Sequence, residues 1–80
     1  MKDRGDDLRR VGGRLRALRR EAGETQAQTA ASIGISRQYM SEAESGANLT
    51  LAVIYRLADH FGVAPASILD DAARESGEGR

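Results

Sequence analysis

The 80-residue sequence has no cysteine or tryptophan, and only one histidine, one proline, two tyrosines and one phenylalanine. Without cysteine the chain has no disulfide, thiolate zinc site, iron–sulfur cluster or cysteine nucleophile. Its longest unbroken apolar run, Leu51 to Tyr55, is far shorter than the roughly 18 residues of a membrane span. A chain of this length has room for one small core. We therefore expect a single soluble cytoplasmic domain with no membrane segment.

Groups for catalysis or metal binding are also scarce. His60 is the only histidine and lies just before a helix-ending glycine, where a surface position is more usual than a general base. The serines at 32, 36, 41 and 45 lack a second base to activate them. Asp70 and Asp71 form an isolated acidic pair, whereas a metal site needs several converging ligands. We expect no enzymatic activity, no metal and no cofactor.

Charge is balanced overall but unevenly distributed along the chain. Twelve basic and twelve acidic residues cancel, yet the first 20 residues carry eight basic side chains against three acidic ones. An excess of one sign at one end is typical of a nucleic-acid-facing surface, and equally of a solvated, arginine-rich helix.

Apolar spacing predicts an all-α fold of five short helices. Val11, Leu15, Leu18 and Ala22 form one helical stripe, which we expect to be firm from about residue 9 because Gly12 and Gly13 each cost about 1 kcal/mol relative to alanine. Four further helices are predicted at residues 26–33, 37–45, 51–61 and 65–72. The predicted domain covers 8–73, between an N-terminal arm (1–7) and a disordered tail (74–80).

Helix-capping residues define the second and third helices closely. Thr25 and Gln28 have the spacing of a capping box, and Gly34 stands where a left-handed residue ends a helix. Ser36 is a good N-cap two residues later. So short a turn forces the two helices to cross steeply. In the fourth helix, the predicted inner face is Leu51, Ile54, Leu57, Ala58 and Phe61.

The stretch from Thr25 to Gly46, TQAQTAASIGISRQYMSEAESG, resembles the phage-repressor and Cro-like helix-turn-helix family. The pattern of that family is Ser/Thr-Gln, Ala four residues later, Gly-apolar-Ser in the turn, and Glu-x-Gly at the end. The resemblance covers roughly residues 8–70 and implies a lambda-repressor-like DNA-binding domain. In that fold the second crossed helix places its N-terminal residues in the major groove.

The resemblance implies a set of DNA contacts. Arginine reads guanine, glutamine reads adenine and glutamate accepts from cytosine. The base-contacting candidates are Ser36, Arg37, Gln38 and Glu42. The phosphate-contacting candidates are Gln26, Ser41, Ser45, Gly46 and Ala47.

The resemblance also implies structural roles and exposes departures. Arg19 and Glu44 match a partly buried ion pair that joins the first and third helices in the family. Glu24, Thr29 and Ala43 each stand where the family usually has a larger apolar residue, so we expect a thinner core. Ala47 replaces a common basic residue, which removes one phosphate partner.

The predicted function is sequence-specific binding of a palindromic double-stranded DNA operator by a homodimeric transcriptional regulator. Clustered apolar residues beyond the first core suggest the interface: Val53, Tyr55, Val63, Ile68 and Leu69. The segment Asn48 to Leu51 is similar to restriction–modification controllers, and a phage-type repressor is the other possibility within the family. An antitoxin that neutralises a toxin protein, an RNA-binding arginine-rich helix and a monomer with these residues folded inward remain alternatives.

Overall fold

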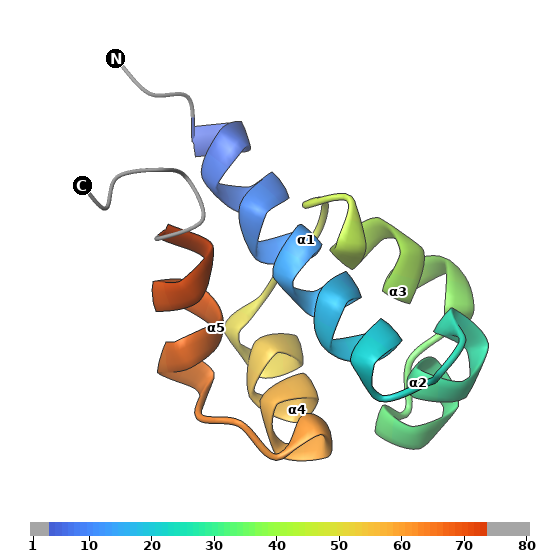
Figure 1. The fold of residues 1–80 in the computed structure, drawn as a ribbon. Helices are drawn as coiled ribbons and strands as arrows, with labels where there is room; N and C mark the ends of the chain where they lie inside the picture. Colours follow the sequence, from blue (N-terminus) through green and yellow to red (C-terminus); the bar gives the residue numbers. More distant parts are fainter. Residues whose placement is uncertain (1–3, 74–80) are drawn as a thin grey trace.

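The computed structural model describes residues 4–73, which form five α-helices and no strand (Figure 1). The all-α, five-helix prediction is therefore confirmed over this range. The helices are α1 (Arg4–Glu21), α2 (Gln26–Ile33), α3 (Arg37–Glu44), α4 (Leu51–Phe61) and α5 (Pro65–Ala73). None of the described helices is long and apolar enough to cross a membrane. The predicted tail, 74–80, and residues 1–3 of the predicted arm lie outside the described residues.

The first helix begins earlier than the sequence suggested. It already includes Arg4, so residues 4–7 are helical rather than part of an arm, and Asp6 and Asp7 lie inside the first turns. Each aspartate pairs with the arginine three residues later: Asp6 with Arg9, and Asp7 with Arg10 at 2.9 Å. Such pairs, and acidic side chains near a helix N-terminus, favour helix in this first segment.

Side-chain N-caps begin the next three helices, at Thr25 and Ser36 as predicted and also at Thr50. The side chain of Thr25 accepts from the Gln28 amide while the Gln28 side chain accepts from the Thr25 amide. Ser36 accepts from the Tyr39 amide at the start of α3, and Thr50 accepts from the Val53 amide at the start of α4. Satisfied N-terminal amides fix where each helix starts.

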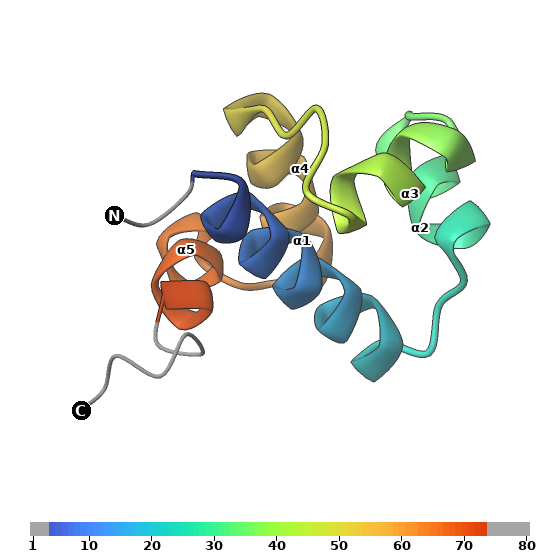
Figure 2. The ribbon, with the colours of Figure 1, turned by 90° about the horizontal axis from the view of Figure 1, so that it is seen from above.

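One core joins all five helices, and all its members are side chains with less than a tenth of their surface exposed. They are Val11, Leu15, Leu18, Ala30, Met40, Val53, Ile54, Leu57, Ala58 and Ile68. Figures 1 and 2 show α1 between α5 on one side and α2 and α3 on the other, and α4 contacts both α5 and α2. The helix-turn-helix pair and α5 are therefore on different sides of α1.

Four predicted burial assignments are wrong. Leu51 is 63% exposed whereas Val53 is 5% exposed, because the face of α4 that meets the core is rotated relative to the predicted stripe. Ile68 is fully buried within the domain and therefore cannot present its side chain to a second copy. Ala22 follows the last residue of α1 and is exposed.

The third helix lies very close to the first at Gly12. A Cβ added to Gly12 would lie 2.7 Å from the backbone oxygen of Ala43 and even nearer to that of Glu44. Gly12 and the fully buried Ala43 are small, so the two helices approach backbone to backbone. This approach fills the space that the sequence suggested would be thinly packed at Ala43.

Candidate nucleic-acid interface

The N-terminal end of α3 is exposed. Ser36, Arg37 and Gln38 are all exposed, while Met40 and Ala43 turn into the core from the same helix. Figure 2 shows α3 beside α2 on the outer side of the domain. The side chains of Arg37 and Gln38 therefore face solvent on a helix that is anchored from behind.

An ion pair anchors the other end of α3. Arg19 Nε donates to Glu44 Oε2 at 2.6 Å, and its terminal Nη2 donates to Glu44 Oε1 at 3.1 Å. The two side chains are 11% and 4% exposed. The Glu44 carboxylate raises the pKa of the Arg19 guanidinium above its ordinary value, mainly through this hydrogen bonding. The pair is the one that the family resemblance implied.

The same network extends to the start of α2. Arg19 Nη1 donates to the Glu24 carbonyl at 2.7 Å, and Gln26 Nε2 donates to Glu44 Oε1 at 3.1 Å. A glutamine amide has two N–H donors, so one is held by Glu44 and the second is left for another acceptor. Gln26 is thus fixed by the residue that also fixes α3.

Three of the predicted phosphate-contacting residues use their donors for hydrogen bonds within the protein. The Gly46 amide donates to the Ala43 carbonyl at 3.0 Å, and the Ala47 amide donates to the Glu42 carbonyl at 2.8 Å. The Ser45 hydroxyl donates to the same Glu42 carbonyl at 2.7 Å. A phosphate oxygen accepts hydrogen bonds and so needs an available donor. The turn after α3 instead uses its donors to close the helix C-terminus.

Both carboxylate oxygens of Glu42, a predicted base-contacting residue, already accept hydrogen bonds within the protein. Its Oε1 accepts from Asn48 Nδ2 at 2.9 Å and its Oε2 accepts from Gln38 Nε2 at 3.4 Å. The Tyr39 hydroxyl donates to the Asn48 carbonyl at 2.8 Å. Asn48 therefore joins the interface, although it was not among the predicted DNA-contacting residues. Its side-chain amide, so near a helix rich in hydrogen-bonding groups, was the available indication.

A second polar cluster explains two departures from the family pattern. The Thr29 hydroxyl donates to Glu24 Oε1 at 2.6 Å, and His60 Nε2 lies 2.8 Å from the same oxygen. The Thr29 hydrogen bond, followed by that of His60, holds the pKa of Glu24 below its ordinary value. Glu24 and Thr29 are therefore matched to each other and to His60, which joins α4 to the loop before α2.

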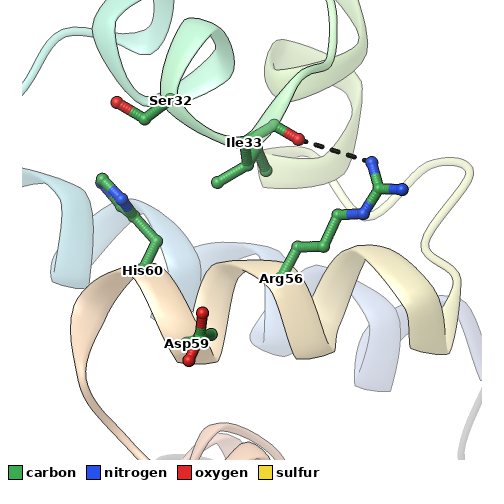
Figure 3. Close-up of a pocket in the computed structure, with 5 residues that line it drawn as sticks. All are labelled: Ser32, Ile33, Arg56, Asp59 and His60. Carbon is green, nitrogen blue, oxygen red and sulfur yellow. Dashed lines mark hydrogen bonds between the residues drawn. The ribbon is translucent and has the colours of Figure 1, made fainter.

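His60 also borders a pocket between α2 and α4 (Figure 3). The pocket has a volume of about 330 Å³ and is lined by Ser32, Ile33, Arg56, Asp59 and His60. Arg56 donates to the Ile33 carbonyl at 3.4 Å, near the end of α2. No residue of α3 lines this pocket, so it lies apart from the exposed end of that helix.

Metal ligands do not gather anywhere in the part of the chain that the structure describes, where no group of three or more histidine or carboxylate side chains is suitably placed. The chemistry that this surface offers is hydrogen bonding from an exposed helix end. Arg37 and Gln38 carry the donors, and Gln26 adds one from the start of α2.

Comparison with known proteins identifies the family of this chain. Residues 10–69 match the family model of the helix-turn-helix domain. The chain belongs to this family. A curated relative, an HTH-type transcriptional regulator called y4dJ from Sinorhizobium fredii, is 44% identical over 59 residues, which cover 71% of this chain and 77% of the relative.

Two solved structures are similar to this helix-turn-helix regulator. The restriction-modification controller protein C.AhdI from Aeromonas hydrophila has a TM-score of 0.73 and 35% identity, covering 78% of this chain and 96% of the controller. The clp gene regulator ClgR from C. glutamicum has a TM-score of 0.77 and 28% identity, covering 85% and 91% of the two chains. The predicted family and fold are confirmed, and the chain is a transcriptional regulator of the helix-turn-helix type.

Proposed function

We propose that this regulator binds a palindromic DNA operator as a homodimer and reads bases with the N-terminal end of α3. The observation that carries the proposal is the exposure of Ser36, Arg37 and Gln38 on a helix whose inner face is fully buried. Arginine matches guanine O6 and N7, and glutamine matches adenine N6 and N7. The Ser36 hydroxyl accepts from the helix and keeps its proton for a base or phosphate.

Phosphate contacts in this proposal come from Gln26 and Ser41. Gln26 lies at the start of α2, where helix amides and the dipole favour an anion, and its side chain retains one donor. Ser41 is exposed one turn along α3. Because phosphates are the same in every sequence, these contacts add affinity without base preference.

The test is selection of bound duplexes from a random library, followed by titration of the selected site with variants. Arg37→Ala should cost about 1–3 kcal/mol on the selected site and relax one base position. Ser41→Ala is the matched control, since it should weaken selected and random duplexes alike. Equal losses for Arg37→Ala on both duplexes would contradict base reading by α3.

Dimerisation is proposed through exposed apolar side chains of α4 and α5. Leu51, Tyr55 and Leu69 are 63%, 57% and 41% exposed, and Leu51 and Tyr55 lie one turn apart on the same face of α4. Val63 adds to this region in part, because it is half-buried against the core. Of α4 and α5, α5 lies across α1 from α3 (Figure 1). Pairing there leaves both α3 helices free to meet successive major grooves about 34 Å apart.

Sedimentation at micromolar concentration tests the dimer. The wild-type chain should sediment as twice 8.6 kDa, and Leu69→Glu should sediment as a monomer because a charge would enter an apolar interface. A single monomeric species for both proteins would contradict the proposal.

The similarity to a restriction-modification controller over 96% of that protein supports a more specific role. We propose that the regulator controls a restriction–modification system. The duplex selected from the random library should then occur upstream of a neighbouring nuclease–methylase gene pair. A selected site that occurs only beside unrelated genes would contradict this role.

A further inference from the structure

We propose that Asn48, which lies outside the recognition helix, positions Gln38 for base reading by holding Glu42 in place. The inference rests on the proposed function, because it concerns how α3 reads DNA. Glu42 is then a positioning residue rather than a reader of cytosine. A chain of hydrogen bonds runs from the loop after α3 to the exposed end of that helix.

Asn48 is held in an unusual backbone conformation. Its φ of 55° is the only positive value at a non-glycine residue in the described part of the chain, and asparagine tolerates this region better than most residues. The Tyr39 hydroxyl fixes its carbonyl at 2.8 Å. With the backbone held in this way, the side-chain amide reaches back to α3 and donates to Glu42 Oε1 at 2.9 Å.

Glu42 is fixed by its backbone as well as by its side chain. Its carbonyl accepts from the Ser45 hydroxyl and from the Ala47 amide, and its side chain is half-buried. With Oε1 engaged by Asn48, Oε2 points along the helix toward Gln38, four residues earlier, and accepts from Gln38 Nε2 at 3.4 Å. Residues four apart on a helix are neighbours on its surface.

This contact selects one orientation of the Gln38 amide. A glutamine that reads adenine uses its oxygen and the N–H on the same side as that oxygen. The second N–H points away from the base, and in this proposal it is the one that donates to Glu42 Oε2. If the amide turned by 180°, its oxygen would face the carboxylate and repel it. Glu42 therefore holds Gln38 with the adenine-reading pair of atoms directed outward.

The carboxylate has an electrostatic consequence as well. A negative charge close to DNA opposes binding to any sequence, so a glutamate kept at this position lowers affinity for random DNA. The Asn48 amide partly offsets the charge by hydrogen bonding to it. Removing Glu42 should therefore change affinity and base preference in opposite directions, which a purely structural residue would not do.

The test measures base preference position by position, with the full-length chain and the duplex that the wild type selects from a random library. Gln38→Ala first identifies the position at which preference is lost. Asn48→Gly is the central variant because glycine accepts a positive φ and keeps the carbonyl for Tyr39, so only the side-chain amide is removed. Thermal unfolding of each variant verifies that it is folded at the titration temperature.

We expect Asn48→Gly to reduce preference at the Gln38 position by about 2- to 10-fold, the cost of ordering one side chain on binding. Preference at the position lost in Arg37→Ala should not change. Glu42→Ala should reduce the same preference and also tighten binding to random duplex, because a negative charge is gone. Glu42→Gln, which keeps the shape, should tighten random binding in the same direction.

Two results would overturn the inference. In the first, Asn48→Gly and Glu42→Ala retain wild-type preference at the Gln38 position. In the second, Gln38→Ala changes no base preference at all. Both results leave the proposed function standing if Arg37→Ala still relaxes a base position. The proposed function fails separately, if the library yields no preferred sequence for the wild type.

Discussion

The two adjacent glycines of α1 provide a sharp test of how α3 is seated. Gly12 and Gly13 lie in the same helix, so alanine at either position gains about 1 kcal/mol of helix propensity. Their surroundings differ completely. A Cβ on Gly13 meets nothing within 4 Å, whereas a Cβ on Gly12 would overlap the backbone of Ala43 and Glu44.

The expected effects therefore have opposite signs. Overpacking costs about 1–3 kcal/mol, and the upper end applies to Gly12→Ala because the obstructing atoms are backbone and cannot rotate away. Once the gain in helix propensity is subtracted, Gly12→Ala should lower the free energy of unfolding by about 2 kcal/mol. Gly13→Ala should raise it by about 1 kcal/mol. For a domain of this size, the difference of about 3 kcal/mol corresponds to melting temperatures at least about 10 °C apart.

Thermal unfolding followed by circular dichroism measures both variants under the same conditions. Gly13→Ala is the matched control, since it makes the same chemical change one residue away. If Gly12→Ala stabilised the domain as much as Gly13→Ala, the backbone of α3 could not lie against α1 at Gly12.

Three further predictions concern single side chains. Glu44→Gln strands the buried charge of Arg19, so it should cost about 3–5 kcal/mol and lower the melting temperature by more than about 10 °C; an unchanged melting temperature with lost DNA binding would instead assign Glu44 to the DNA. Ile68→Ala should lower the free energy of unfolding in urea by about 2–5 kcal/mol; a change within about 0.5 kcal/mol, which is usual at exposed positions, would contradict the burial of Ile68. Because the pKa of Glu24 is lowered in the folded state, its carboxylate stabilises the fold at any pH above the ordinary pKa of glutamate. This stabilisation is lost as the pH falls through the lowered pKa. Urea unfolding at pH 7 and pH 3 should show a smaller acid-induced loss for Glu24→Gln than for wild type, and equal losses would refute the linkage.

Local chemistry allowed most of the helix-turn-helix unit to be predicted from the sequence. The capping box at Thr25, the left-handed Gly34 and the N-cap at Ser36 each act within a few residues. They fix the lengths of α2 and α3 whatever surrounds them. The exposed Arg37 and Gln38 follow from the same boundaries, because a helix that begins at residue 37 and buries Met40 must present its first turn outward.

Contacts between distant residues were decided only by the tertiary structure. Glu24 and His60 are 36 residues apart, and no local pattern indicates that one polar departure compensates another. Likewise, the orientation of α4 determines that Val53 is buried and Leu51 exposed, since apolar residues on three sides of that helix allow more than one inner face.

For the hydrogen-bond donors at the interface as well, the sequence indicated the residues and the tertiary structure decided their partners. The sequence identified Gly46 and Ala47 as residues beside the recognition helix, but only the fold commits their amides to the carbonyls of α3. The sequence alone determined where α2, α3 and α4 start, because caps and turns depend on near neighbours. The tertiary structure decided that Gly12, and not Gly13, has no room for a side chain. It also decided that the Gly46 and Ala47 amides are engaged within the protein. Both depend on how closely α3 lies against α1 and against its own C-terminal loop.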